Sequence, residues 1–315
     1  MSRYAWIRTA VIAATAAVTA LAPSAATASP PIGLIAYSDV SRTQATDPVT
    51  VRVPAGSSAY VGRYTLAPGT GLGWREMPGV AIFSALSGTL RVVRHDCSLK
   101  DAHTGMSAVF PAGQYLIGNQ GPDPVEFVAV FVNLRRGAAQ PLSGPALRRA
   151  PADCIVSPRW TNPAVGGLFV TDLASGRFAE RALRADGSGH LRQAGGGRIA
   201  LEQGHDILVS TMTAAPGASS GWTSQYPALT FVNSGRLTYY EAVDDGCVKR
   251  AVFGPGDAYG RSDGGLNMVV NEGSVPATAT SVYVNIPHRG VGLPIGNHLE
   301  AIDFTQLPPL ECGRL

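Results

Sequence analysis

The chain has 315 residues, 45% of them hydrophobic and 15% charged, which is typical of a packed globular protein and excludes an intrinsically disordered one. The 25 basic and 22 acidic side chains nearly balance, so the sequence lacks the basic excess of proteins that bind nucleic acid or anionic membrane surfaces. Its length is sufficient for two ordinary domains.

The N-terminus has the pattern of a secretory signal peptide. Arg3 and Arg8 form a basic segment, residues 9–21 form an apolar segment, and Ala26-Thr27-Ala28 is a small-residue cleavage site. We therefore expect residues 1–28 to be removed and the mature protein to be secreted. The apolar segment is too short to span a bilayer comfortably, and no second long apolar run follows. No membrane partner is expected after cleavage.

One stretch, residues 66–90, occurs a second time as residues 214–237. Both copies contain Pro-Gly, then Gly-Trp, an apolar run, Ser-Gly and a second apolar segment. A period of about 150 residues indicates a duplicated domain, because solenoid repeats are much shorter. The matched positions are Trp74 with Trp222, Ser87-Gly88 with Ser234-Gly235, 110–113 with 253–256, 119–121 with 271–273, and 131–134 with 282–286.

Short apolar runs bounded by Gly and Pro predict strands in both units. The clearest is 125–134, whose continuous β-branched and aromatic residues are typical of a strand buried on both faces. Residues 29–48 are expected to be a leader, 135–153 a connection with one short helix, and 160–172 an approach to the second unit. Other expected strands are 50–53, 59–66, 80–86, 89–93, 106–110, 179–183, 199–201 and 206–213. The pattern favours an all-β fold, with a small antiparallel barrel or sandwich used twice.

Four cysteines in an exported protein predict two disulfides, for which the count alone allows three connectivities. The repeat favours one of them. Cys97 and Cys247 end the two motif regions, Cys154 follows the first unit, and Cys312 lies near the end of the second. The symmetric pairing is therefore Cys97–Cys154 and Cys247–Cys312. A redox or metal site is a weaker reading, because no CxxC motif is present.

The pattern PG…GW-x-x-x-PG…SG-T-L, followed by P-x-G and N-x-G before a hydrophobic strand, resembles the cupins. The resemblance covers about 60–135 and 208–288. It implies two tandem cupin jelly-roll β-barrels, a bicupin. With the signal peptide at 1–28, the expected domains are 29–154 and 155–315. Cupins usually hold a divalent metal at the mouth of the barrel, and the resemblance locates the ligand positions.

The positions that carry metal-binding histidines in the family hold other residues in both units. They are Arg75, Met77 and Tyr115 in the first unit, and Thr223, Gln225 and Asn267 in the second. Arg cannot give up its proton to ligate a metal, a Met thioether suits hard cations poorly, and Thr, Gln and Asn are weak neutral donors. We therefore expect both barrels to be free of metal and of any other cofactor.

Some of the pocket candidates have two readings from sequence alone. Trp74 and Trp222 are either core residues or the aromatic wall of a ligand pocket. Arg75 and Glu76 point to opposite faces of a strand, so Arg75 is either an inward anion clamp or part of a surface ion pair. In Tyr239-Tyr240, one ring is expected to face inward and the other outward.

Two functional hypotheses follow. The first is a secreted bicupin that binds an unidentified small molecule or carbohydrate without catalysis, or that has a structural role. The alternative is a cupin-type enzyme, an oxidoreductase or an isomerase, with an atypical site in one barrel. No catalytic residue is assigned. Cupins often dimerise, so a homo-oligomer is kept as an open alternative, although two barrels in one chain already supply an internal pseudo-dimer.

Overall fold

The computed structural model describes residues 35–54, 56–135, 140–142, 145–147, 154, 160, 168–178, 197–224, 226–242, 248–261 and 266–288, all within one compact unit, Pro31–Leu315. Twenty β-strands make up the named elements of these ranges, which confirms the all-β prediction. None of the described residues form a helix long and apolar enough to cross a membrane. The expected strand 179–183, the signal peptide, Gln225, Cys247 and Cys312 lie outside the described residues.

The strands of the first half are β1 (Ile35–Ala45), β2 (Val49–Val53), β3 (Ser58–Leu66), β4 (Gly71–Met77), β5 (Val80–Ser87), β6 (Thr89–Arg94), β7 (Leu99–His103), β8 (Met106–Phe110), β9 (Gly113–Gly118) and β10 (Val125–Leu134). Those of the second half are β11 (Leu168–Phe178), β12 (Gly197–Leu201), β13 (Asp206–Ala214), β14 (Thr223–Ser224), β15 (Ala228–Ser234), β16 (Leu237–Ala242), β17 (Val248–Phe253), β18 (Asp257–Arg261), β19 (Leu266–Val270) and β20 (Ala277–Ile286). Each strand of the first half corresponds to the strand numbered ten higher in the second.

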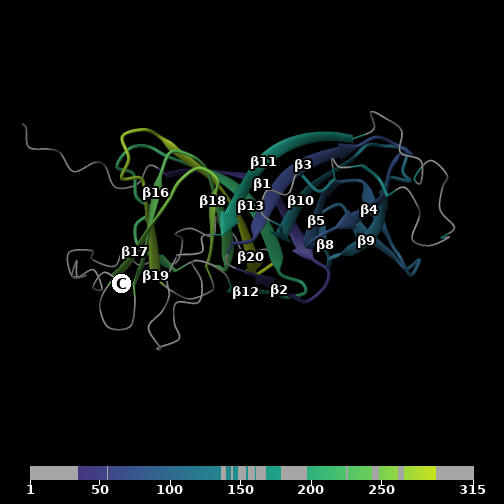
Figure 1. Ribbon diagram of the computed structural model, residues 1–315, viewed down its shortest axis with the longest axis horizontal. Helices are drawn as coiled ribbons and strands as arrows, with labels where there is room; N and C mark the ends of the chain where they lie inside the picture. Colours follow the sequence, from purple (N-terminus) through teal and green to yellow (C-terminus); the bar gives the residue numbers. More distant parts are fainter. Residues whose placement is uncertain are drawn as a thin grey trace, which may run out of the picture. The chain divides into compact units, whose positions relative to one another are not determined.

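Ten strands form one closed barrel, the central barrel, in the order β1-β13-β20-β15-β18-β11-β3-β10-β5-β8 (Figure 1). Two four-stranded sheets complete the halves. The first outer sheet has the order β4-β9-β6-β7, and the second outer sheet has the order β14-β19-β16-β17. Each half thus has the two facing sheets of a jelly roll, and the central barrel joins both halves. The short pair β2 and β12 also links the halves, with Val51 opposite Ile199.

The halves exchange their first strands. β1 pairs antiparallel with β13 from Ile35↔Ala214 to Gln44↔Asp206, and β11 pairs with β3 from Leu168↔Leu66 to Arg177↔Ser58. The expectation that 29–48 is only a leader is therefore wrong for 35–45. The expected approach segment 160–172 likewise enters a strand at Leu168. The domain limits 29–154 and 155–315 remain a prediction, and strand pairing crosses them.

Alternation along the strands of the central barrel creates three cores. In β10, Val128 and Val130 face the central core inside the barrel, whereas Phe127 and Phe131 face the opposite way. We call the core on that opposite side, between the central barrel and the first outer sheet, the first interior. The equivalent core of the second half, which contains Tyr259, is the second interior. Burial on both faces explains the unbroken apolar run of β10.

The turns of the duplicated motif have the same backbone in both halves. Asn119 donates from Nδ2 to the carbonyl oxygen of Leu66 at 3.1 Å, and Asn271 donates to that of Ala214 at 2.8 Å. Each Asn also accepts a hydrogen bond from the amide two residues later. Paired glycines with positive φ support the same conclusion: Gly56 and Gly204, Gly69 and Gly217, Gly73 and Gly221, Gly88 and Gly235.

One match drawn from the sequence is wrong. The counterpart of Gly256 is Gly105 and not Gly113. Gly105 has a φ of +80° and Gly256 has a φ of +84°. The Gly105 amide donates to the Ala85 carbonyl at 2.9 Å, and the Gly256 amide donates to the equivalent Val232 carbonyl at 3.1 Å. The similar Pro and Gly residues of 110–113 and 253–256 led to a match that is one strand too late in the first half. The long-range hydrogen bonds that define the turn at Gly105 cannot be read from the sequence.

Candidate functional site

The positions singled out by the cupin resemblance lie opposite each other on the outer sheets. Arg75 of β4 is paired with Tyr115 of β9, and Thr223 of β14 is paired with Asn267 of β19. Met77 lies on the same face of β4 as Arg75. Of the eight pocket candidates, the structure therefore brings together three in the first half and two in the second.

Aromatic rings fill the first interior. Phe83 contacts Phe110, Phe127 and Phe131, with ring centroids 5.4, 5.8 and 5.9 Å away. Tyr115 packs edge-on against Phe110 at 5.5 Å. These separations lie in the range of favourable aromatic pairs, and buried aromatic rings contribute much of the stability of a core. Met77 is 1% exposed and belongs to the same cluster, so its thioether serves packing.

The residues at the family's ligand positions do not fit a divalent metal. The Tyr115 hydroxyl donates to the Pro111 carbonyl at 2.7 Å, and burial raises the pKa of Tyr115 above its ordinary value. Arg75 Nε donates to the Leu72 carbonyl at 2.8 Å. Within the described ranges, no group of three or more His, Cys, Asp or Glu is arranged to hold a metal ion. We therefore derive no metal-dependent step for this chain.

Arg75 faces inward and Glu76 outward. Arg75 is 8% exposed, and burial lowers the pKa of its guanidinium, whereas Glu76 is exposed. Strand alternation predicted this opposition, and burial decides which of the two readings holds. The surface ion pair is the wrong reading for Arg75.

Trp74 packs on the outer face of the first outer sheet, in a cluster with Val93, Leu116 and Trp160. Trp160 lies on the cross-strand pair Gly71↔Gly118. A Cβ at Gly118 would lie 2.4 Å from Trp160 Cδ2, so these glycines provide the space for the indole. Trp74 thus belongs to the core under Trp160, and the pocket-wall reading does not apply to it. Trp222 is also buried.

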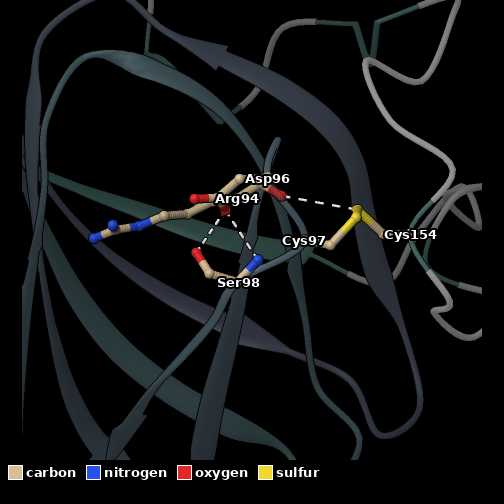
Figure 2. The surroundings of a disulfide bond; sticks show 5 residues. All are labelled: Arg94, Asp96, Cys97, Ser98 and Cys154. Carbon is tan, nitrogen blue, oxygen red and sulfur yellow. Dashed lines mark hydrogen bonds between the residues drawn. A yellow bond between two sulfur atoms is a disulfide. The ribbon is translucent and has the colours of Figure 1, made fainter.

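The disulfide Cys97–Cys154, with a Cα–Cα distance of 5.3 Å, is the first of the two expected pairs. Cys154 packs against the Trp160 cluster, and its Sγ lies 3.9 Å from the Arg94 carbonyl oxygen. Figure 2 shows the Arg94 side chain running away from the disulfide. The disulfide therefore lies on the side of the Trp160 cluster, at the outer face of the first outer sheet, and the Arg94 side chain points away from it.

The second interior contains a row of hydroxyl groups that sequence reasoning missed. Ser210, Ser281, Thr230 and Tyr259 lie opposite one another on four neighbouring strands, β13, β20, β15 and β18. All four residues are buried. Thr230 and Ser281 hydroxyl oxygens are 2.9 Å apart and hydrogen bonded. We call these four residues the hydroxyl row. Their neighbours along each strand, including Leu229 and Val282, face the central core instead.

The equivalent row in the first half is apolar. Gly62, Ala129, Phe83 and Ala108 lie opposite one another in the corresponding order. Phe83, the centre of the aromatic cluster, is thus replaced by Thr230 in the second half. At these four positions the two interiors have the same strand pairing but differ in polarity. Only the strand pairing reveals the row, because its members are scattered along the sequence.

At the rim of the second interior, Tyr239 and Tyr240 confirm the predicted inward and outward orientations. Tyr239 is buried, with its ring 5.2 Å from Tyr259. Tyr240 instead donates a hydrogen bond to Glu272 on the outer side, where Arg250 Nη2 lies 2.5 Å from Glu272 Oε2. Thr223 Oγ1 donates to the Asn267 carbonyl at 3.3 Å. Of these residues, Tyr239 contacts the hydroxyl row, through the Tyr259 ring.

No protein-family model matches the sequence, and no curated protein matches it significantly. Among solved structures, the chain is similar to oxalate decarboxylase from Bacillus subtilis at pH 4.6, with 12% identity, a TM-score of 0.33, and coverage of 80% of this chain and 76% of that one. A structure of the same enzyme, from work on its Mn(II) centres, matches with 13% identity, a TM-score of 0.33, and coverage of 80% and 77%. At these values the similarity carries no argument about activity.

Proposed function

We propose that this chain is a secreted protein of bicupin architecture that binds a neutral, hydroxyl-bearing small molecule or a carbohydrate, without catalysis, in its second interior. The hydroxyl row is the single observation that carries this proposal. Hydroxyl groups both donate and accept, so they suit a ligand with the same groups. A row of four across neighbouring strands also matches the way polar groups are placed in an otherwise apolar ligand site.

The contrast between the two interiors supports the second as the binding site. Phe83 and Phe127 of the first interior are replaced by Thr230 and Ala279 in the second, and Ala108 of the first is replaced by Tyr259. The second interior also contains the packed rings of Tyr239, Phe253 and Tyr259, so the proposed ligand would contact an aromatic ring as well as the hydroxyl groups. Thr223 and Asn267 at the rim supply further hydrogen-bonding groups.

Thr230→Val is expected to weaken ligand binding roughly tenfold, because it removes one hydroxyl at nearly constant volume. A panel of neutral mono- and disaccharides and sugar alcohols would first be screened by thermal shift, and the best binder then titrated by calorimetry. Thr230→Phe, which introduces the ring of the first interior, should abolish binding.

Thr43→Val is the matched control. Thr43 is also a buried threonine, and its hydroxyl is hydrogen bonded to Ser107 beside the central core. The control should lose stability to a similar extent but bind the sugar normally. Failure of every compound in the panel to bind, or equal weakening by Thr43→Val, would contradict the proposal.

The proposals of export and of a metal-free protein can be tested on one sample. Protein secreted by its natural route and purified without chelator should begin at Ser29 and contain far less than one equivalent of transition metal, by N-terminal sequencing and elemental analysis. The Cys97–Cys154 disulfide supports an oxidising compartment. About one equivalent of tightly held metal would instead favour the alternative of an enzyme with an atypical site.

A further inference from the structure

Two arginines flank a tyrosine on three neighbouring strands of the first outer sheet. Arg75 of β4 and Arg94 of β6 both lie opposite Tyr115 of β9. Opposite residues on adjacent strands have their Cβ atoms about 5 Å apart and point to the same face. We call Arg75, Tyr115 and Arg94 the guanidinium row.

The guanidinium row faces the first interior. Tyr115 belongs to that core, as does Val92, two residues before Arg94. The intervening residues Val93 and Leu116 belong to the outer cluster under Trp160. The course of the Arg94 side chain in Figure 2, away from the disulfide, agrees with this assignment. Arg75 is deeply buried and Arg94 is partly exposed, so the row begins in the protein and ends at solvent.

The row contains a buried donor for which the described part of the chain offers no acceptor. Among the described residues, Arg94 Nε is buried and has no hydrogen-bond partner. Buried donors without a partner are rare and costly, and a ligand is one way to satisfy them. Asp47 and Asp96 lie close enough for the Arg94 charge to act on them, but their hydrogen bonds go to other groups. Asp47 pairs with Lys100, and Asp96 accepts hydrogen bonds from the Ser98 amide at 2.9 Å and hydroxyl at 2.6 Å.

The second half supplies an internal comparison. Thr223, Asn267 and Glu241 occupy the corresponding positions, with Thr223 and Glu241 both opposite Asn267. Two cationic side chains in the first half are therefore replaced by a neutral and an acidic one. The positive row is confined to the first outer sheet.

We propose that the guanidinium row binds a small oxyanion, a carboxylate or a phosphate, at the end of the first interior. Guanidinium groups match the planar oxygens of carboxylates and the oxygens of phosphates, and burial strengthens such charge-assisted hydrogen bonds. Tyr115 lies between the two arginines in strand order, and its hydroxyl donates to the Pro111 carbonyl. This site is separate from the hydroxyl row, so either proposal can fail without the other.

The test is calorimetric titration of the oxidised mature chain with succinate and with inorganic phosphate, each against sodium chloride of equal ionic strength. The unmodified protein should bind at least one oxyanion saturably. Arg94→Gln should weaken that binding roughly tenfold to hundredfold, the range for a lost charged hydrogen bond. Binding of succinate alone identifies a carboxylate site, and binding of phosphate alone identifies a phosphate site.

Arg91→Gln is the matched control, because it removes one positive charge from the same strand. Arg91 forms an ion pair with Asp101 at 2.6 Å. The Arg91→Gln variant should therefore keep its oxyanion affinity within about twofold of that of the unmodified protein. Arg94→Met keeps an apolar stem and replaces Arg94→Gln if that variant does not unfold cooperatively. No saturable binding by the unmodified protein, equal weakening by Arg91→Gln, or full affinity in the Arg94 variant would overturn the proposal.

Discussion

Trp160→Ala should lower the free energy of unfolding by about 3–5 kcal/mol, the usual cost of deleting a large buried aromatic side chain. Trp160 is 1% exposed. It packs against Trp74, Val93 and Leu116 of the first outer sheet. Denaturant unfolding measures the loss. Phe169→Ala is the matched control, because Phe169 is 66% exposed and should change stability by no more than about 0.5 kcal/mol.

A double-mutant cycle with Gly118→Ala tests the contact itself. The new Cβ would lie 2.4 Å from Trp160, so Gly118→Ala alone should cost about 1–3 kcal/mol. In the Trp160→Ala background the obstruction is gone, and the cost should fall substantially. An equal cost in both backgrounds would show that Trp160 does not lie on this glycine pair.

Removing the Cys97–Cys154 disulfide with Cys97→Ser and Cys154→Ser together should cost about 4 kcal/mol. The two cysteines are 57 residues apart in sequence, and the chain-entropy relation predicts this loss for a loop of that size. Denaturant unfolding of the double variant and of the oxidised protein measures the difference. Unchanged stability would mean that the unfolded chain is already compact without the crosslink.

Peptide mapping without reductant provides the control for connectivity. It should recover Cys97 linked to Cys154 and, by the symmetry of the repeat, Cys247 linked to Cys312. The second pair remains a prediction from sequence. A peptide linking Cys97 to Cys247 would contradict the assignment of both disulfides within their own units.

Local features of the fold could be predicted because they depend on local chemistry. Gly88 and Gly235 adopt the same left-handed φ of +69° in the turns predicted from Ser-Gly. Asn119 and Asn271 close equivalent turns. The strand predicted at 125–134 matches β10, because continuous burial on both faces leaves no polar positions in its sequence.

The candidate sites were only partly predictable. The cupin resemblance identified Arg75 and Tyr115 as pocket candidates, but not Arg94, because Arg94 becomes their neighbour only through strand pairing. The hydroxyl row was missed for the same reason. Ser210, Thr230 and Ser281 are common residues in strands, and nothing near them in the sequence distinguishes them.

The sequence by itself determined the duplication, the all-β class and the turns, since each depends on residue types and their local spacing. Tertiary structure decided the exchange of β1 and β11, the position of Trp160 on two glycines, and the gathering of four hydroxyl groups in the second interior. The physical reason is that alternation reports only that a strand has two different faces. Which strand lies beside it, and which core each face enters, is set by long-range hydrogen bonding and packing.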